Sequence, residues 1–171
     1  MTYIANLAFK RSAWFILMMS ALILEVTALI FQYQMDLAPC IMCIYQRTAV
    51  LGIFIAGLIA LTNPNNIFVR VTAYGIWSIS AIWGYFIAVE HIDMQTNTDP
   101  FAFTCDIIPN FPSFMPLHEW IPSFFAAPGD CGEISWQFLG LSMPVWMQII
   151  FGIYSLILIT MISTNLFKKR I

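Results

Sequence analysis

Residues 39–62 read Pro-Cys-Ile-Met-Cys-Ile-Tyr-Gln-Arg-Thr-Ala-Val-Leu-Gly-Ile-Phe-Ile-Ala-Gly-Leu-Ile-Ala-Leu-Thr, so a Cys-x-x-Cys pair stands at the start of an apolar run. A hydrocarbon core about 30 Å thick is crossed by about 20 residues of α-helix. The run is long enough to span a membrane, and Pro39 suits the first turn of a helix, where its missing N–H is no loss. The pair Cys40 and Cys43 is therefore expected at a membrane surface.

The composition excludes a soluble domain of this length. Hydrophobic residues make up 60% of the 171 residues, charged residues 9%, and the mean hydropathy is +0.81. We predict an all-α integral membrane protein, a single membrane domain over residues 1–171 that forms an antiparallel four-helix bundle. No basic stretch exceeds three residues, so we expect no nucleic-acid partner. The windows able to cross a bilayer are about 13–33, 44–62, 71–89 and 145–163.

The charges predict which way the bundle faces, because Lys and Arg in short loops favour the cytoplasm. Residues 71–167 contain no Lys or Arg, whereas seven acidic residues lie between positions 90 and 133. We expect both termini in the cytoplasm, with a short loop at about 34–39 and a long one at about 90–143 outside it. A cleaved signal peptide is the alternative for the first span, but that run is longer than the ~7–15 apolar residues of such a segment. The orienting residues are Lys10, Arg11, Arg70, Lys168, Lys169 and Arg170.

The long loop contains six prolines and is expected to be mostly irregular. Between Pro116 and Phe125, apolar residues recur at roughly helical spacing, which predicts a short helix lying in the membrane interface. A small folded patch that covers the ends of the spans would give the same pattern. The sequence leaves both interpretations open.

Cys40, Cys43 and Arg47 follow one another at spacings of three and four residues, and so share one helix face. The free N–H groups of the first turn, the positive end of the helix dipole and the arginine cation all favour a thiolate there. The three residues are therefore candidate catalytic groups. An arginine within a span costs about 2.5–3.5 kcal/mol, and snorkelling to the interface is the alternative role for Arg47.

A Cys-x-x-Cys pair also occurs as half of a zinc site or as a structural disulfide. Zinc needs about four ligands, and no second paired motif supplies the rest, so we expect no metal. The remaining cysteines, Cys105 and Cys131, lie in the long loop, where a structural disulfide is common. The first pair changes this interpretation, because a mobile loop above a reactive dithiol can bring its cysteines within exchange distance. Two pairs in one membrane protein indicate an electron relay.

Three further residues are candidates by position. His91 is expected level with the cysteine pair, where it would donate a hydrogen bond or a proton to a reduced acceptor, or simply occupy the interface. Met143 and Trp146 are placed to wall a lipophilic pocket. Glu25 lies in the middle of the first span, where an ionisable group is a functional candidate by default, and we expect it to have a packing role.

These residues, taken in order, strongly resemble the DsbB family of bacterial disulfide-bond formation membrane proteins. The match runs from about Ala13 to Phe167 and includes all four cysteines and the arginine. Gln46 stands where an acid is common in the family, and Phe103 is an extra residue before Cys105. The segments that carry the match are Glu25-Val-Thr-Ala-Leu29, Pro39-Cys-Ile-Met-Cys-Ile-Tyr-Gln-Arg47, Glu90-His91, Pro100-Phe-Ala-Phe-Thr-Cys-Asp106, Gly129-Asp-Cys131 and Phe138-Leu-Gly-Leu-Ser-Met-Pro-Val-Trp146.

The resemblance implies an inner-membrane enzyme, with both redox pairs on the periplasmic side, that reoxidises the thiol oxidase DsbA and passes two electrons to membrane quinone. It implies that Cys105 forms a mixed disulfide with DsbA and releases Cys131. Cys131 then attacks Cys40, and Cys43 leaves as a thiolate held by Arg47. The quinone-binding residues that it implies are Cys43, Arg47, His91 and Met143.

The redox energetics constrain this relay independently of the family. DsbA is known as a strong oxidant at about −120 mV, whereas structural disulfides lie below about −300 mV. Transfer from DsbA to a loop disulfide of the structural kind would be opposed by roughly 8 kcal/mol, at about 1.4 kcal/mol per 30 mV. Both pairs are therefore expected to be unusually oxidising, unless quinone reduction pulls the relay forward.

Three alternative functions fit the same residues. A quinone reductase similar to vitamin K epoxide reductase uses the same kind of cysteine pairs in the opposite net direction. A DsbB paralogue dedicated to one partner keeps the chemistry and changes the thiol donor. A non-enzymatic four-helix scaffold would tolerate serine at Cys40 and Cys43, whereas the relay would not.

Overall fold

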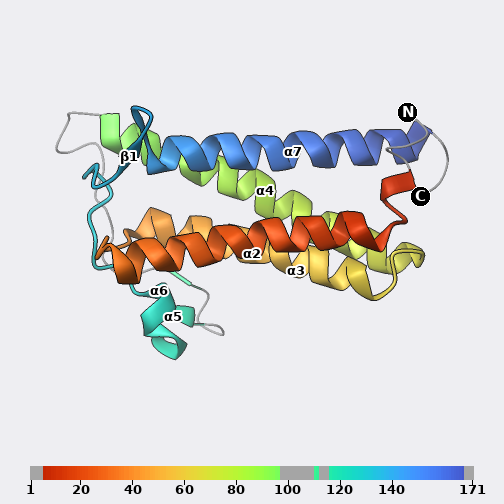
Figure 1. Cartoon of the computed structure of the whole chain (residues 1–171), viewed down its shortest axis with the longest axis horizontal. Coiled ribbons are helices and arrows are strands. Elements are labelled where there is room, and N and C mark those ends of the chain that lie inside the picture. Colours follow the sequence, from red (N-terminus) through yellow and green to blue (C-terminus); the bar gives the residue numbers. More distant parts are fainter. Residues whose placement is uncertain (1–5, 97–109, 112–115, 168–171) are drawn as a thin grey trace.

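Four long helices dominate the part of the chain that the computed structural model describes, which is residues 6–96, 110–111 and 116–167. All four are long and apolar enough to cross a membrane, and they run alongside one another (Figure 1). The predicted all-α, four-helix membrane fold is confirmed, and each predicted span lies within one helix. The helices are α2 (Arg11–Gln34), α3 (Ile41–Thr62), α4 (Ile67–Thr96) and α7 (Met143–Phe167).

Packing follows the order α2, α3, α4, α7, because each of these neighbours makes an extensive contact with the next. Small residues let the backbones approach: a Cβ on Gly57 would lie 2.9 Å from the backbone nitrogen of Met18. Among the described residues, α2 and α7 do not form a comparable pair. Midway along this seam they are joined by the hydroxyls of Ser20 and Tyr154, 2.9 Å apart. Large apolar side chains cover the outside, as lipid requires, including Phe15, Ile16, Ile23, Phe68, Ile79, Phe86, Ile153, Leu156 and Ile159.

One end of the bundle is built around a buried arginine. Arg70 is 5% exposed, donates a hydrogen bond to the Pro64 carbonyl at 3.0 Å and lies 4.3 Å from the ring centroid of Phe9. Arg11 reaches the Thr62 carbonyl at 3.3 Å. These contacts tie the start of α2 to the turn between α3 and α4. That this end faces the cytoplasm stays a prediction.

Helix α4 is longer than the predicted span, because it continues past residue 89 to Thr96. No proline or glycine interrupts residues 85–96, and the acidic side chains of Glu90 and Asp93 face outward without breaking the backbone hydrogen bonds. The long connection to α7 therefore begins about two turns later than expected. It ends at Met143, as expected, with Pro144 in the first turn of α7.

The segment predicted as one interfacial helix consists of two single turns, α5 (Leu117–Trp120) and α6 (Pro122–Phe125). The break falls at Ile121, because a residue before proline avoids the helical region and Pro122 has no N–H to continue the ladder. Phe125 is buried against the start of α3, whereas Trp120 and Ile121 are exposed. The segment thus covers a helix end and also presents apolar side chains outward. Its place in a membrane interface stays a prediction.

A short β-hairpin, with two residues in each strand and two in the turn, precedes α7, where irregular chain was expected. Strands β1 (Gln137–Phe138) and β2 (Leu141–Ser142) pair in antiparallel fashion. The two turn residues, Leu139 and Gly140, have φ values of 54° and 77°, and the glycine adopts this left-handed conformation without steric cost. The indole of Trp146 donates to the Phe138 carbonyl at 3.1 Å and holds the hairpin on α7.

Candidate redox site

The two cysteines at the start of α3 are free thiols in direct contact. Cys40 is the N-cap residue, and its sulfur accepts a hydrogen bond from the backbone N–H of Cys43 at 3.3 Å. The two sulfur atoms lie 2.8 Å apart. Cys40 is 3% exposed, whereas Cys43 is only partly buried. The pair is therefore arranged to close to a disulfide without moving the helix.

The two thiols are not equivalent. The hydrogen bond with the Cys43 side chain raises the pKa of Cys40 far above its ordinary value, and burial raises it further. A thiol with a raised pKa keeps its proton across the neutral range. Cys40 is therefore the proton-bearing member of the reduced pair, which leaves Cys43 as the member that carries negative charge.

His91 lies beside Cys40, as its position in the sequence predicts. Its Nε2 atom is 3.5 Å from the Cys40 sulfur, and its Nδ1 atom is 3.3 Å from the amide nitrogen of Gln46. Because an amide nitrogen donates, Nδ1 accepts and Nε2 carries the proton toward the sulfur. The imidazole also forms a hydrogen bond with the backbone of Cys131. His91 thus connects the membrane pair with the loop cysteine.

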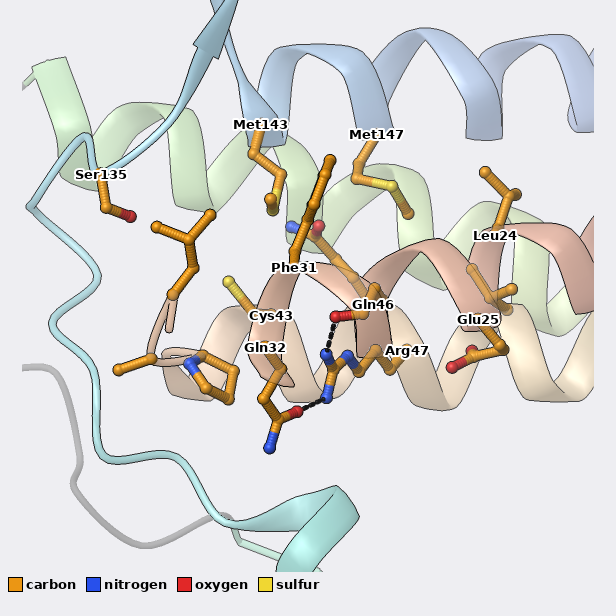
Figure 2. A pocket seen from close by; sticks show the side chains of 15 residues that line it. Leu24, Glu25, Phe31, Gln32, Cys43, Gln46, Arg47, Ser135, Met143 and Met147 are labelled. Atoms are coloured by element: carbon orange, nitrogen blue, oxygen red, sulfur yellow. Dashed lines mark hydrogen bonds between the residues drawn. The ribbon is translucent and has the colours of Figure 1, made fainter. Parts of the chain in front are cut away.

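Arg47 is held inside the bundle by α2 and the loop. It is 7% exposed, and its guanidinium donates to Gln32 Oε1 at 2.6 Å and to the Ala28 carbonyl at 2.7 Å (Figure 2). It also donates to the Phe124 carbonyl at 3.4 Å. These are neutral acceptors, so the positive charge is solvated but not neutralised by them. Snorkelling into water does not describe this side chain, because its head group contacts protein on α2 and on the loop.

Cys43 and Arg47 share one cavity between α2, α3 and α7 (Figure 2). Its volume is about 90 Å³, less than the ~300–1,000 Å³ of most ligand pockets. Two methionines, Met143 and Met147, form its α7 wall, and such flexible side chains can swing aside for a flat ring. The donor set fits a quinone head group, since a cation and a reactive sulfur face an otherwise mostly apolar space. The other lining residues are Leu24, Glu25, Ala28, Phe31, Gln32, Leu37, Ala38, Pro39, Gln46, Val50 and Ser135.

The predicted quinone-binding residues do not all line this cavity. Cys43, Arg47 and Met143 do, whereas His91 lines a second cavity of about 30 Å³ that also borders Cys40 and Cys43. Met143 and Cys43 border both cavities. His91 is therefore better placed to act on Cys40 than on a ligand beside Arg47.

The loop that carries Cys131 is docked onto the start of α3. The backbone N–H of Gly129 donates to the Pro39 carbonyl at 3.0 Å, and a Cβ at Gly129 would collide with the Ala38 carbonyl. Cys131 is 1% exposed, belongs to the same buried cluster as Cys40 and takes part in a disulfide. The predicted partner, Cys105, lies outside the described residues.

Three potential metal ligands meet at this site. Ligand atoms of Cys40, Cys43 and His91 lie within 4.8 Å of one another. A structural zinc site uses four ligands, and within the described ranges no fourth histidine, cysteine or carboxylate joins this group. The expectation of a metal-free site stays a prediction.

Sequence reasoning missed two residues that organise the site, Gln32 and Gly129. Gln32 stands seven residues after Glu25, two helical turns along the same face of α2, and this spacing was the signal that could have found it. Gly129 stands in a segment that carries the family resemblance, but its role could not be assigned, because the need for a glycine there arises only when the loop meets Ala38.

Comparison with known proteins identifies the relatives of the chain. Residues 10–161 match the protein family described as Disulfide bond formation protein DsbB. The chain is 58% identical over 170 residues to Disulfide bond formation protein B of Pseudoalteromonas translucida, with 99% of each chain covered. It is 52% identical to the protein of that name from Pseudoalteromonas atlantica, again over 170 residues and 99% of each chain. The protein of that name from Aeromonas hydrophila is 44% identical over 168 residues, which cover 98% of this chain and 96% of the relative.

Proposed function

Because the chain belongs to the DsbB family and is a disulfide-forming membrane oxidoreductase, we propose that it reoxidises a DsbA-like periplasmic thiol oxidase and passes the two electrons to membrane quinone. The observation that supports this most directly is the shared cavity of Cys43 and Arg47 beside a free dithiol. A thiolate next to a fixed cation, in a space lined by apolar side chains, suits an apolar two-electron acceptor.

The proposed relay starts in the loop. A thiolate of the reduced partner attacks Cys105, and Cys131 leaves. Cys131 attacks the sulfur of Cys40. The two residues belong to one buried cluster, and the Gly129–Pro39 hydrogen bond keeps the segment of Cys131 beside the start of α3, so the attack needs little movement of the loop. Cys43 leaves as a thiolate.

The relay ends in the cavity between α2, α3 and α7. Arg47 stabilises the Cys43 thiolate there. The second thiol of the partner then resolves the mixed disulfide and frees Cys105, which attacks Cys131, restores the Cys105–Cys131 disulfide and releases Cys40. The Cys40–Cys43 disulfide re-forms as the acceptor takes two electrons. As the Cys40 thiol loses its proton, the Nε2–H of His91, 3.5 Å from that sulfur, stabilises the negative charge that develops on it. Met143 closes the cavity from α7. Ubiquinone and menaquinone both have the required chemistry.

The proposed location is the bacterial inner membrane, with both termini in the cytoplasm and both cysteine pairs at the periplasmic face. The described basic side chains Arg11 and Arg70 lie at the end opposite the cysteines, as cytoplasmic retention of Lys and Arg requires. Labelling of single cysteines introduced into the loop or into the turn at 63–66 tests this orientation in intact cells, since a membrane-impermeant thiol reagent should reach a cysteine in the loop and not one in the turn.

The decisive experiment uses purified protein, a reduced DsbA-like oxidase and a soluble quinone analogue. We expect quinone-dependent oxidation of the partner by the wild type, and a trapped mixed disulfide through Cys105 when the second active-site cysteine of the partner is replaced by serine. Net electron flow from quinol to the partner would identify a reductase of the vitamin K epoxide reductase kind instead. Unchanged turnover in Cys131→Ser, or the absence of a complex through Cys105 with that partner variant, would reject the proposed roles of the loop cysteines.

A further inference from the structure

Glu25 is a buried acid whose carboxyl group is left without a hydrogen-bond donor in the described part of the bundle. It is 5% exposed and lies in the middle of α2. Neither carboxyl oxygen has a hydrogen-bond partner among the residues that the structure describes. Buried polar atoms are almost always satisfied, and an ionised carboxylate left unsatisfied in an apolar interior is costly. The expected packing role does not account for this arrangement, because a packing role is filled better by an apolar side chain.

The surroundings of Glu25 point to the cavity. The side chain lines it together with Cys43 and Arg47, as Figure 2 shows. Its carboxyl group interacts electrostatically with the Arg47 guanidinium. The two form no ion pair within the described ranges, because the guanidinium donates its hydrogen bonds to Gln32 and Ala28 instead. A carboxyl group that faces a cavity beside a cation, and that no donor from the described part of the chain engages, is positioned for a ligand.

The chemistry of the proposed reaction leaves one proton without a donor. Two-electron reduction of a quinone to a hydroquinone takes up two protons, one at each oxygen. In the reduced pair Cys40 holds a proton and Cys43 is the thiolate, so the dithiol supplies only one. The second proton must come from another group in the same water-poor space.

We propose that Glu25 is the second proton donor, giving its carboxyl proton to the acceptor oxygen that lies on the α2 side of the cavity. This inference rests on the proposed function. The sulfurs of Cys40 and Cys43 lose two electrons as their S–S bond forms, Cys40 releases its thiol proton, and Glu25 releases its carboxyl proton. The charge stays at −1 throughout, because a thiolate and a carboxylic acid are converted to a disulfide and a carboxylate.

Arg47 then stabilises the negative charge both before and after the reduction step. Before it, the guanidinium stabilises the Cys43 thiolate; after it, the same cation stabilises the Glu25 carboxylate. Arg47 is coupled electrostatically to both groups. The carboxylate regains a proton before the next cycle. One fixed cation therefore accompanies a negative charge that moves from sulfur to oxygen.

The test compares Glu25→Gln with Glu25→Asp and wild type, using ubiquinone-1 as the probe. Glutamine keeps the size and polarity but has no acidic proton, whereas aspartate keeps the proton on a shorter arm. We expect Glu25→Gln to bind the probe as wild type does and to reduce it about 10²-fold more slowly in a single turnover of the pre-reduced protein. Glu25→Asp should recover part of the rate.

Two further measurements separate the inference from the proposed function. Formation of the mixed disulfide between the reduced partner and Cys105 in quinone-free protein should be unchanged in Glu25→Gln, because this first step takes place at the loop pair and precedes the release of the Cys43 thiolate into the cavity. In wild type, infrared difference spectra of the quinone-reduction step should show loss of a carboxylic acid C=O band, which needs no variant to fold.

The outcomes are distinct. A wild-type single-turnover rate in Glu25→Gln, loss of probe binding in that variant, or no change in the infrared band would overturn the inference while leaving the relay intact. Failure of the wild type to reduce the probe would instead overturn the proposed function.

Discussion

Two buried arginines stand at opposite ends of this bundle, and their surroundings differ. Arg70 is 5% exposed and Arg47 is 7% exposed, so burial does not distinguish them. Arg70 contacts a backbone carbonyl of the α3–α4 turn and an aromatic ring. Arg47 also donates to backbone carbonyls, but it borders a cavity with a free thiol and an unsatisfied acid. We therefore propose a redox role for Arg47, which shares its space with reactive groups, and a structural role for Arg70, which closes a turn.

Removing the thiol next to Arg47 should have the largest effect. In Cys43→Ser the S–S bond of the membrane pair cannot form, so quinone-linked oxidation of the partner should fall to background. The measurement is quinone absorbance with purified protein, and thermal unfolding controls for the fold. Turnover at the wild-type rate would show that the redox reaction does not take place at the end of the bundle that contains Arg47.

Exchanging each arginine for methionine tests the contrast between the two ends directly. Arg47→Met should lower kcat/KM for quinone about 100-fold, which corresponds to roughly 2.7 kcal/mol of transition-state stabilisation. Arg70→Met should leave kcat/KM within about twofold but lower the free energy of unfolding by about 1–3 kcal/mol, because a buried carbonyl loses its donor. The reverse pattern would invert the assignment of the two ends.

Alanine substitutions at two glycines test whether close backbone contacts are needed for the exchange step or only for stability. Gly129→Ala should separate the loop from Ala38 and slow transfer from Cys131 to Cys40 about tenfold, while quinone reduction by the pre-reduced membrane pair stays unchanged. Gly57→Ala, where α2 and α3 touch, should lower stability and spare the exchange step. Rapid acid quench followed by thiol labelling measures the exchange. Equal exchange rates in the two variants would contradict a docking role for Gly129.

The smallest effect is expected between the two ends, at the hydroxyl contact of α2 with α7. Ser20→Ala removes one interhelical hydrogen bond and should cost about 0.6 kcal/mol, an average value for such bonds in membranes. Unfolding in mixed detergent micelles measures it, with Ser78→Ala as a matched control, because the Ser78 hydroxyl bonds only within its own helix. A larger loss than in Arg70→Met would mean that the seam, and not the turn, holds the bundle together.

Hydropathy alone was sufficient to predict the four spans, because a lipid-facing helix carries its signal at every position. Pro39 and the cysteine spacing likewise placed the thiol pair at a helix start, since both are local features. The partners of Arg47 could not be predicted, because Gln32 and the Ala28 carbonyl reach it only after α2 packs on α3. The end of α4 was misjudged for a different reason: hydropathy reports where lipid stops, whereas a helix continues until its hydrogen-bond ladder is interrupted.

The weak contact between α2 and α7 has a consequence for how an acceptor arrives. A lipophilic acceptor that reaches the proposed cavity between these two helices would enter from among the acyl chains and would not cross bulk water. Its encounter rate then depends on its mole fraction in the bilayer and not on its molarity in the suspension. Adding inert phospholipid at constant protein and acceptor should slow turnover, whereas adding buffer should not.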